Sequence, residues 1–480
     1  MWGRKVAQPG SSEGVQHPET VQLASLSKSL LRLPPMQQTL LETGRLSAGF
    51  RDPAFNRNRE FPLHRWVPWV AGFSAEFVDD CLIKYLPARR SARRPCVLDP
   101  FAGVGTTLVQ GLVHGCDVVG FEINPYAALA TRTKLNALRV SPAKFQLSIT
   151  AFEGFMAGRP RTYSKPRTTP PTGFSGRTQL FGPIIERKVL FAIDFINALE
   201  HEEIRDLFRL ALGSVMVSFS NYSYEPSLTR RVAVGKALIE DAEVGKVISA
   251  KLRLMLDDIR WLRSQVGQLR GGPASKVYSA SIFTARDHLR KNSVDLVVTS
   301  PPYLNNYHYP RNTRPQLHWL GFASGPGYKG AREAESFGTF WQTVRGLPPI
   351  GMSFDLPELA EVTETIRGLN LDKGAYGGPG WANYVTRYFN DTYRFCSVVA
   401  EALRPGGAAV VVLGNSIIQG IEVKTDQYFG QIAELCGLKF EDTLLLREKR
   451  TGNSIIRSSV RVDKATRKTV LYESAIVLRK

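Results

Sequence analysis

Cysteine is scarce in this chain of 480 residues, and its spacing follows no known pattern. The five cysteines are an odd number and form no C-x-x-C pair, and the seven histidines include no H-E-x-x-H sequence. These spacings exclude a disulfide framework and give no support for a structural or catalytic metal site. Five reduced cysteines in a cytosolic protein are the simpler interpretation.

Long apolar runs are also missing. The longest, such as Ala408 to Leu413, are far too short to cross a bilayer. The segment Met1 to Gly10 contains no apolar core of a secretory signal. We therefore expect neither membrane insertion nor secretion.

Acidic residues are in the minority, because 43 Asp and Glu stand against 62 Lys and Arg and give a formal net charge of +19. An excess of this size indicates a polyanionic partner, since basic side chains displace condensed counterions from phosphates. The hydrophobic share of 43% and the charged share of 22% are ordinary for globular proteins. They exclude a wholly disordered or collagen-like chain.

The hydrophobic pattern divides the chain into four parts. Residues 1–60 are polar and are predicted to form a partly flexible N-terminal extension. Residues 61–140 alternate strand, helix, strand and helix with short joints, which is the pattern of parallel βαβ units. Residues 141–275 are predicted to be a mostly helical insert, and the α/β pattern resumes over 276–480 with a loop-rich insertion at 304–380. The sequence thus predicts an α/β fold in which a helical insert separates two halves of one sheet.

Individual elements follow from apolar runs and from helical spacing, and residues 141–184 are expected to be irregular. The predicted strands are Cys96–Leu98, Asp117–Phe121, Val277–Ile282, Val294–Thr299, Ala408–Leu413, Glu441–Arg447 and Lys468–Leu478. The predicted helices include Thr106–His114, Pro125–Leu138, Ile193–Leu212, Val232–Val266, Trp381–Leu403 and Thr425–Cys436.

A glycine turn follows the first predicted strand, and an acidic residue ends the next strand. Asp99 lies at the carboxyl end of the first strand, where open α/β sheets bind ligands. Gly103 and Gly105 let the backbone bend tightly and approach a ligand that a Cβ would block. Glu122 ends the second strand, where a carboxylate can accept two hydrogen bonds from a ribose diol. This arrangement suits an adenosyl cofactor, although the two glycines could also serve only to pack helix on strand.

Cofactors with a pyrophosphate fit this turn less well. The dinucleotide fingerprint needs a third glycine where this chain has Leu108. A phosphate-binding P-loop needs a lysine after the second glycine, where this chain has Thr106.

Two prolines directly follow a later strand, in the sequence Ser300-Pro301-Pro302-Tyr303. Pro301 and Pro302 fix φ and remove two N–H donors, and Pro301 pushes Ser300 toward extended geometry. Ser300 Oγ and a main-chain carbonyl of this rigid turn can accept the two N–H bonds of an exocyclic amine, and Tyr303 can stack on the ring of a base. The alternative is a strand-terminating turn in which Ser300 and Tyr303 are packed by chance.

At these two places the chain resembles the S-adenosylmethionine-dependent amino methyltransferases. The segment Leu98–Gly105, with the sequence LDPFAGVG, is similar to their motif I, and Thr299–Tyr303, with the sequence TSPPY, is similar to their motif IV. The Ser-Pro-Pro-Tyr form is commonest in DNA N4-cytosine enzymes, whereas adenine-N6 relatives more often begin with Asp or Asn. The resemblance covers roughly 61–140 and 276–460 and implies a Rossmann-like methyltransferase sheet.

The resemblance also implies roles for individual residues. Motif I would line the methionine side of the cofactor, Glu122 would hold the ribose, and the segment 64–74 is similar to motif X, which closes over the amino-acid end. The implied cofactor-binding residues are His64, Trp66, Phe73, Asp99, Phe101, Gly103, Gly105 and Glu122. The implied catalytic residues are Ser300, Pro301, Pro302 and Tyr303, and no metal is implied.

Two further segments bear on the pocket that the resemblance implies. Gly414-Asn415-Ser416 is similar to a later motif that shapes the target pocket. Where family members often carry Gly-Asp near the adenine of the cofactor, this chain has Tyr278-Ser279-Ala280-Ser281, which leaves the adenine contacts open.

The function that the resemblance implies is transfer of a methyl group from S-adenosylmethionine to N4 of cytosine in double-stranded DNA. A base inside a duplex cannot reach such a pocket, so the nucleotide must be flipped out. The helical insert occupies the place where some family members recognise their target. Candidates for phosphate contacts are Arg230, Arg231, Arg311, Arg314 and the basic segment 447–468. The protein would act in the prokaryotic cytoplasm, associated with the nucleoid, with a cognate restriction endonuclease as a candidate partner.

Several alternatives stay open. DNA adenine-N6 methylation is the closest, since Ser and Asp can both accept the amine hydrogens. A tRNA guanine-N2 methyltransferase usually carries an RNA-binding domain ahead of the catalytic part, for which residues 1–60 look too short. A catalytically dead DNA-binding relative is disfavoured by Asp99, Glu122 and Ser300. Cytosine-C5 methylation needs a Pro-Cys nucleophile after the cofactor motif, and Pro95-Cys96 precedes it. The recognition sequence and the oligomeric state do not follow from the sequence.

Overall fold

The computed structural model describes residues 50–480 apart from 53, 70–71, 87–92, 159–164, 173, 175–177, 226, 267–271, 305–308, 324–334 and 450–470. Everything described belongs to one unit, Leu46–Lys480. The predicted N-terminal extension up to residue 49 and most of the basic segment 447–468 lie outside the described residues.

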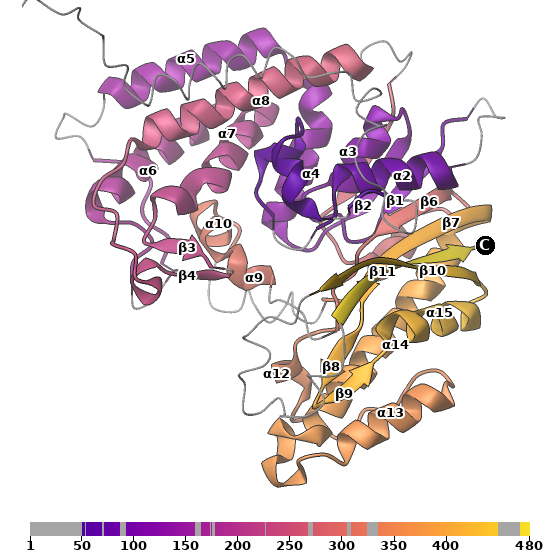
Figure 1. Ribbon diagram of the computed structural model, residues 1–480. Helices are drawn as coiled ribbons and strands as arrows, with labels where there is room; N and C mark the ends of the chain where they lie inside the picture. The colour runs from indigo at the N-terminus through magenta and orange to yellow at the C-terminus, as the bar shows by residue number, and fades with distance from the viewer. Residues whose placement is uncertain are drawn as a thin grey trace, which may run out of the picture. The chain divides into compact units, whose positions relative to one another are not determined.

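A seven-stranded sheet has the order β10-β11-β7-β6-β1-β2-β5 (Figure 1). Five of its strands pair in parallel, whereas β11 pairs antiparallel with both β7 and β10. The strands of this sheet are β1 (Cys96–Asp99), β2 (Asp117–Phe121), β5 (Ser275–Tyr278), β6 (Val294–Thr299), β7 (Leu403–Gly414), β10 (Lys439–Lys449) and β11 (Leu471–Arg479). The result is a mixed α/β fold that is consistent with the predicted Rossmann-like methyltransferase sheet.

Helices fill the connections between the strands (Figure 1). Those before β5 are α2 (Ala75–Tyr85), α3 (Thr106–Val113), α4 (Pro125–Leu135), α5 (Pro142–Gly158), α6 (Pro183–Asn197), α7 (Glu202–Val215) and α8 (Val244–Val266). Those after β5 are α9 (Tyr309–Asn312), α10 (Arg314–Trp319), α12 (Trp341–Val344), α13 (Pro357–Arg367), α14 (Gly378–Ala402) and α15 (Thr425–Leu435). Two short hairpins also form, β3 (Tyr222–Tyr224) with β4 (Leu228–Arg230) and β8 (Ser416–Ile418) with β9 (Ile421–Val423).

Both faces of the sheet are covered, which explains why its central strands are apolar on both sides. Val97 of β1 belongs to the core that contains Leu108 of α3, whereas its neighbour Leu98 belongs to the core that contains Phe395 of α14 and Phe429 of α15. Successive residues of a strand point to opposite faces, so one short strand contributes to two cores.

The chain changes its direction of travel across the sheet at β1. From β1 it moves to β2 and β5 on one side, and it later forms β6 and β7 on the other side. Open α/β sheets bind ligands outside the carboxyl ends of their strands at such a switch point. The ends of β1 and β6, where Asp99 and Ser300 lie, are therefore the expected ligand edge.

The region between β2 and β5 differs in detail from the prediction. Residues 142–158 were predicted to be irregular, but they form α5, which buries Phe145, Ile149, Phe152 and Met156 at helical spacing. This spacing was present in the sequence and was outweighed by the irregular stretch that follows it.

The two helices predicted in this region also have different limits. The predicted helix Ile193–Leu212 is two helices, because α6 ends at Asn197 and α7 begins at Glu202, where acidic residues favour a new helix start. The predicted helix Val232–Val266 begins only at Val244, since residues 231–234 form a 3₁₀ turn that is closed by Gly235 at φ +73°.

The predicted loop-rich insertion 304–380 contains a helix that the prediction missed. In α13 the buried residues Leu359, Thr363 and Ile366 repeat at helical spacing, and Pro357 occupies the first turn. The strand predicted over 277–282 is also shorter, because β5 ends at Tyr278 and Ser281 caps a 3₁₀ turn instead.

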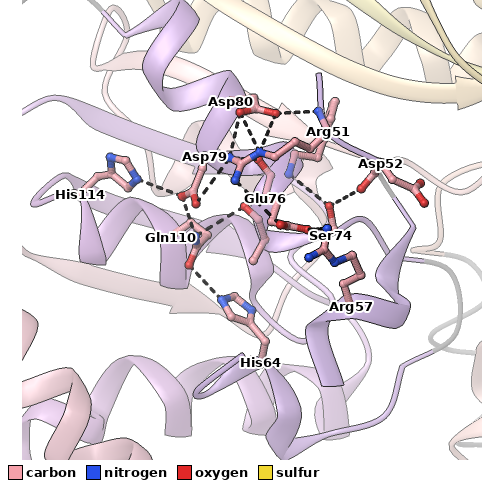
Figure 2. Close-up of polar contacts among 12 residues, drawn as sticks. Arg51, Asp52, Arg57, His64, Ser74, Glu76, Asp79, Asp80, Gln110 and His114 are labelled. Carbon is pink, nitrogen blue, oxygen red and sulfur yellow. Dashed lines mark hydrogen bonds and ion pairs between the residues drawn. The ribbon is translucent and has the colours of Figure 1, made fainter. Parts of the chain in front are cut away.

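The first described residues are anchored on α2. Phe50 is 1% exposed. The guanidinium of Arg51 donates to both carboxylate oxygens of Asp80 over 2.8–3.1 Å, and its Nη2 also donates to the main-chain oxygen of Glu76 at 2.8 Å (Figure 2). Among the described residues, packed structure is therefore already present at Phe50 and Arg51, ahead of the predicted boundary at residue 60.

Replacing Arg51 with alanine is expected to lower the free energy of unfolding by about 3 kcal/mol or more, because Asp80, with a side chain only 18% exposed, loses its bidentate partner. Arg253 is a matched control. It also makes a bidentate pair, with Glu153, but these side chains are 50% and 32% exposed, so Arg253→Ala should cost less than about 1 kcal/mol. Urea unfolding measures both costs, and equal costs would contradict the importance of burial.

Candidate active site

The ends of β1 and β6 are joined directly by side chains. The hydroxyl of Thr299, the last residue of β6, donates to Oδ1 of Asp99 at 2.7 Å. Thr107, at the start of α3, donates to the main-chain oxygen of Val298 at 3.1 Å. The glycine turn that follows Asp99 and the proline turn that begins at Ser300 therefore leave the same edge of the sheet next to each other.

Asp99 connects these two turns through hydrogen bonds to its carboxylate. Its Oδ1 also accepts a hydrogen bond from the main-chain N–H of Phe101 at 3.1 Å, and the residue is 2% exposed. Burial raises the pKa of Asp99 to about 6, and the hydrogen bonds from Thr299 and Phe101 act in the opposite direction. The carboxyl group thus holds the turns together, and its contact with a cofactor stays a prediction.

The glycine turn needs both of its glycines for backbone reasons. Gly103 and Gly105 have φ values of +51° and +86°, in the left-handed region that side chains disfavour. A Cβ on Gly105 would lie 2.9 Å from Cγ2 of Thr131, whose hydroxyl donates to the main-chain oxygen of Gly103 at 2.8 Å. A Cβ on Gly103 would lie 3.5 Å from Nε1 of Trp69. The turn is therefore held between α4 on one side and Trp69 on the other.

Glu122 links the end of β2 to the glycine turn. Its Oε2 accepts a hydrogen bond from the N–H of Gly103 at 2.8 Å, and its Oε1 accepts one from the N–H of Asn124 at 2.7 Å. These bonds fix both carboxylate oxygens at the ligand edge. Because a carboxylate oxygen can accept more than one hydrogen bond, this position is compatible with the predicted ribose diol.

A lysine that the sequence analysis did not single out supports the glycine turn through a hydrogen bond to its main chain. Nζ of Lys134 on α4 donates to the main-chain oxygen of Val104 at 2.8 Å, and the side chain is fully buried. Burial lowers the pKa of Lys134 to about 7, with a further contribution from the positive charge of Lys251. Nine of the eleven residues of α4 are buried, Lys134 among them, so no spacing in the sequence singled this lysine out.

The buried amine predicts a pH-dependent stability. The pKa of Lys134 falls from 10.5 to about 7 on folding. Between these two pH values the unfolded chain binds a proton at this lysine that the folded protein does not, so the stability is highest above pH 10.5 and falls as the pH is lowered to 7. The free energy of unfolding should therefore rise by up to about 5 kcal/mol between these pH values.

The variant Lys134→Met should lack this rise, whereas Lys246→Met, which removes an 81% exposed lysine of α8, should keep it. Urea unfolding at several pH values provides the comparison. A variant Lys134→Met with the wild-type pH profile would mean that the amine stays charged in the folded protein.

Three residues of the predicted motif X segment have their side chains packed against the surrounding helices. His64 shares a 3.0 Å hydrogen bond with Gln110 of α3 (Figure 2), and burial lowers its pKa to about 3. Because Nε2 of Gln110 donates to Asp79, its Oε1 is the acceptor and His64 is the donor. Nε1 of Trp66 donates to Asp258 of α8 at 2.9 Å, and Phe73 packs on Phe77.

The side chains of His64, Trp66 and Phe73 therefore have partners in α3, α8 and α2, and their contact with a cofactor stays a prediction. Trp69, from the same segment, is the residue that approaches Gly103. It is an additional candidate that the sequence did not single out.

The proline turn is braced on β7 and β11. The ring of Tyr303 lies against Gly414, where a Cβ would be 3.4 Å from the ring, and its hydroxyl donates to Oε1 of Glu473 at 3.1 Å. The hydroxyl of Ser416 donates to the main-chain oxygen of Leu304 at 2.6 Å. The structure thus brings the predicted segments 300–303 and 414–416 together.

The ring of Phe101 packs against the core that contains Phe395 of α14 and Phe429 of α15. Its ring centroid lies 5.3 Å from that of Phe337 and 5.5 Å from that of Phe395. These contacts attach the glycine turn to α14, and the predicted contact of Phe101 with a cofactor is not tested by them.

Of the arginines predicted to contact phosphates, those that are described lie on neighbouring elements. The hairpin β3–β4, which carries Arg230, touches the end of α9, because Tyr224 and Leu228 both hydrogen-bond to Asn312. Arg311 lies on α9 and is exposed. The hairpin and α9 are therefore in direct contact in the described structure.

Within the ranges that the structure describes, no helix is both long and apolar enough to cross a membrane. Among the same residues, no three His, Cys, Asp or Glu side chains are grouped so that they could hold a metal ion.

Comparison with known proteins points to one class of enzyme. The chain is 24% identical over 453 residues to the type II methyltransferase M.AvaI of Anabaena variabilis, covering 87% of each chain. It is 21% identical over 445 residues to the type II methyltransferase M.BsoBI of Geobacillus stearothermophilus, covering 84% of this chain and 83% of the relative. The chain is thus similar over most of its length to type II methyltransferases, which supports a methyltransferase.

A shorter match is to an enzyme of the same class. The type II methyltransferase M.MvaI of Kocuria varians is 23% identical over 228 residues, covering 46% of this chain and 50% of the relative. No family model matches the chain. Among solved structures, the rRNA methyltransferase aviRa from Streptomyces viridochromogenes is 12% identical and has a TM-score of 0.28, which is too low to support an argument.

Proposed function

We propose that this protein is a DNA methyltransferase that moves a methyl group from S-adenosylmethionine to the exocyclic N4 of a flipped-out cytosine. The observation that carries the proposal is the 2.7 Å hydrogen bond between Thr299 and Asp99, which joins the glycine turn to the proline turn at one sheet edge. A cofactor held by the first turn would lie beside a base held by the second. The similarity to type II methyltransferases supports methyl transfer, and the choice of base rests on the proline turn.

The residues at the glycine turn fit an adenosyl cofactor. Glu122 is fixed at the end of β2, where it can accept the hydroxyl groups of a ribose, and the backbone at Gly103 is open to a ligand except for the neighbouring Trp69. When bound, S-adenosylmethionine supplies an electrophilic methyl group on a sulfonium. Asp99 and Lys134 would hold the glycine turn rigid through hydrogen bonds to its main chain, so that binding of the cofactor does not have to order the turn.

The residues at the proline turn fit an amino group on a planar base. Ser300 Oγ and a main-chain carbonyl of the turn can accept the two N–H bonds of the amine, which orients the nitrogen lone pair toward the cofactor. Pro301 and Pro302 keep these acceptors in place, since their φ angles are fixed. The ring of Tyr303 would stack on the base, a contact worth about 1–3 kcal/mol.

The choice of cytosine rests on Ser300 as the first residue of the turn, and adenine-N6 is the alternative target. We also propose that the surface formed by β3–β4 and α9, with Arg230 and Arg311, contacts the phosphates of the DNA. A protein with this activity would work on the genome in the cytoplasm, together with any cognate restriction endonuclease.

The deciding experiment is a nucleoside analysis. Unmethylated amplified DNA is incubated with the protein and S-adenosylmethionine carrying a labelled methyl group, then digested and measured by mass spectrometry. We expect label in N4-methylcytosine. Label in N6-methyladenine would move the assignment to the alternative base.

Two controls test the rest of the proposal. Unmodified tRNA, offered in place of DNA, should take up no label, and label in N2-methylguanine would contradict a DNA substrate. A protein that binds the cofactor and DNA but transfers no label would contradict the enzymatic proposal itself. Methylation should also fall steeply with salt, because phosphate contacts release counterions.

A further inference from the structure

Three residues lie side by side across the three strands nearest to Tyr303. In the register of the sheet Glu473 of β11 is paired with Gly414 of β7 on one side and with Arg447 of β10 on the other. Residues directly opposite each other on adjacent strands have their side chains within contact distance. This row ends under the ring of Tyr303, which lies against Gly414.

Glu473 holds the hydroxyl of Tyr303. Its Oε1 accepts the hydrogen bond from Tyr303 at 3.1 Å, and its Oε2 pairs with Nε of Arg447. Glu473 is 5% exposed, and a carboxylate at this depth needs both a counter-charge and hydrogen-bond donors. Arg447 supplies the charge and Tyr303 supplies a donor.

The neighbours of Glu473 serve a different purpose on the other face of β11. Tyr472 and Ser474 both donate side-chain hydrogen bonds to Asp426 of α15, at 3.0 Å each. Since side chains alternate along a strand, Glu473 is the member of this trio that faces Tyr303. On one face of β11, Tyr472 and Ser474 therefore bind the carboxylate of Asp426, and on the other face the carboxylate of Glu473 binds Tyr303 of the proline turn.

The ring of Tyr303 is held on three sides. Gly414 lies under it, Glu473 fixes its hydroxyl, and Ser416 fixes the main chain at Leu304 directly after it. Stacking on a base needs only the ring, which phenylalanine would provide equally well. The hydroxyl has its use in the bond to Glu473.

We propose that Glu473 is a positioning residue for methyl transfer, because it fixes the Tyr303 ring as a preformed surface on which the target base stacks. This inference rests on the proposed function. A ring that is already fixed loses no further freedom when the base arrives, so the base is held closer to the geometry needed for transfer. Arg447 is the counter-charge that is paired with Glu473 at this depth.

The test is a set of variants of the full chain, assayed on unmethylated amplified DNA. Tyr303→Phe removes the hydroxyl, Glu473→Leu removes the acceptor, and Glu473→Gln keeps an amide oxygen that can still accept the bond. We expect Tyr303→Phe and Glu473→Leu each to lower kcat roughly tenfold, with cofactor affinity within about twofold of wild type. Glu473→Gln should recover most of the lost kcat.

The double variant Tyr303→Phe/Glu473→Leu should be no slower than either single variant, because both remove the same interaction. Tyr472→Phe is the matched control, since it deletes a tyrosine–carboxylate bond on the other face of the same strand. It should affect thermal stability and leave kcat unchanged.

Three outcomes would overturn the inference: losses in kcat that multiply in the double variant, a loss in Glu473→Gln as large as in Glu473→Leu, or an equal loss in Tyr472→Phe. Each of these needs an active wild-type protein. A wild-type protein that methylates no DNA would instead overturn the proposed function, and the inference with it, so the two failures are distinguishable.

Discussion

Replacing Glu122 with alanine is expected to weaken the binding of S-adenosylmethionine by about 100-fold, which corresponds to about 3 kcal/mol. The variant loses the charged acceptor for the ribose hydroxyls. It also loses the carboxylate that holds the main-chain N–H groups of Gly103 and Asn124. Glu122→Gln keeps the shape and one acceptor oxygen, so we expect a smaller loss, of about tenfold. Calorimetry measures both affinities.

The two contributions to this loss can be separated with a modified ligand. Wild-type protein should bind S-adenosylhomocysteine more tightly than its 2′,3′-dideoxy analogue, because only the former offers hydroxyl groups to Glu122. Glu122→Ala should bind the two about equally. If wild type and variant showed the same preference between the two ligands, the ribose assignment would be rejected and only the support of the glycine turn would remain.

Replacing Ser300 with alanine is expected to reduce turnover on unmethylated DNA by more than about tenfold, the low end for losing a positioned polar group. The hydroxyl is proposed to accept a hydrogen bond from the reacting amine, a contact that matters most during transfer. Cofactor affinity should stay within about twofold, since the contact between the two turns is made by Thr299 and Asp99.

A matched serine is available at the opposite end of β6. Ser293 donates its hydroxyl to the main-chain oxygen of Arg290 at 2.6 Å, far from the carboxyl end of the strand. Ser293→Ala should therefore turn over like wild type. Turnover of Ser300→Ala at the wild-type rate would remove the catalytic assignment of the hydroxyl.

The central strands could be predicted because their sequences admit one interpretation. β1, β2, β6 and the second half of β7 are short, mostly apolar runs, each ended by a turn, and burial on both faces makes such runs nearly continuous in the sequence. The helices α5 and α13 were missed for a different reason. Their apolar residues have helical spacing, but they lie beside stretches rich in Pro, Gly and Thr that favoured an irregular interpretation.

The candidate site was predictable in its main chain and less so in its side chains. The two turns could be located because glycine and proline constrain the backbone locally. Lys134 and Trp69 were not found, since a buried amine and an approaching indole depend on how distant segments pack. Glu473 is separated from Tyr303 by 170 positions, and only the register of β11 between β7 and β10 reveals the contact.

The position of β11 has a consequence for how the molecule is made. β11 is the last of the seven strands in chain order, yet it lies between β7 and β10, which do not pair with each other in the sheet. While the polypeptide emerges from the ribosome, β7 therefore presents an open edge and β10 has no place to dock. The sheet closes only when β11 is delivered, so Tyr303 acquires its hydrogen bond to Glu473 long after the proline turn itself has been synthesised.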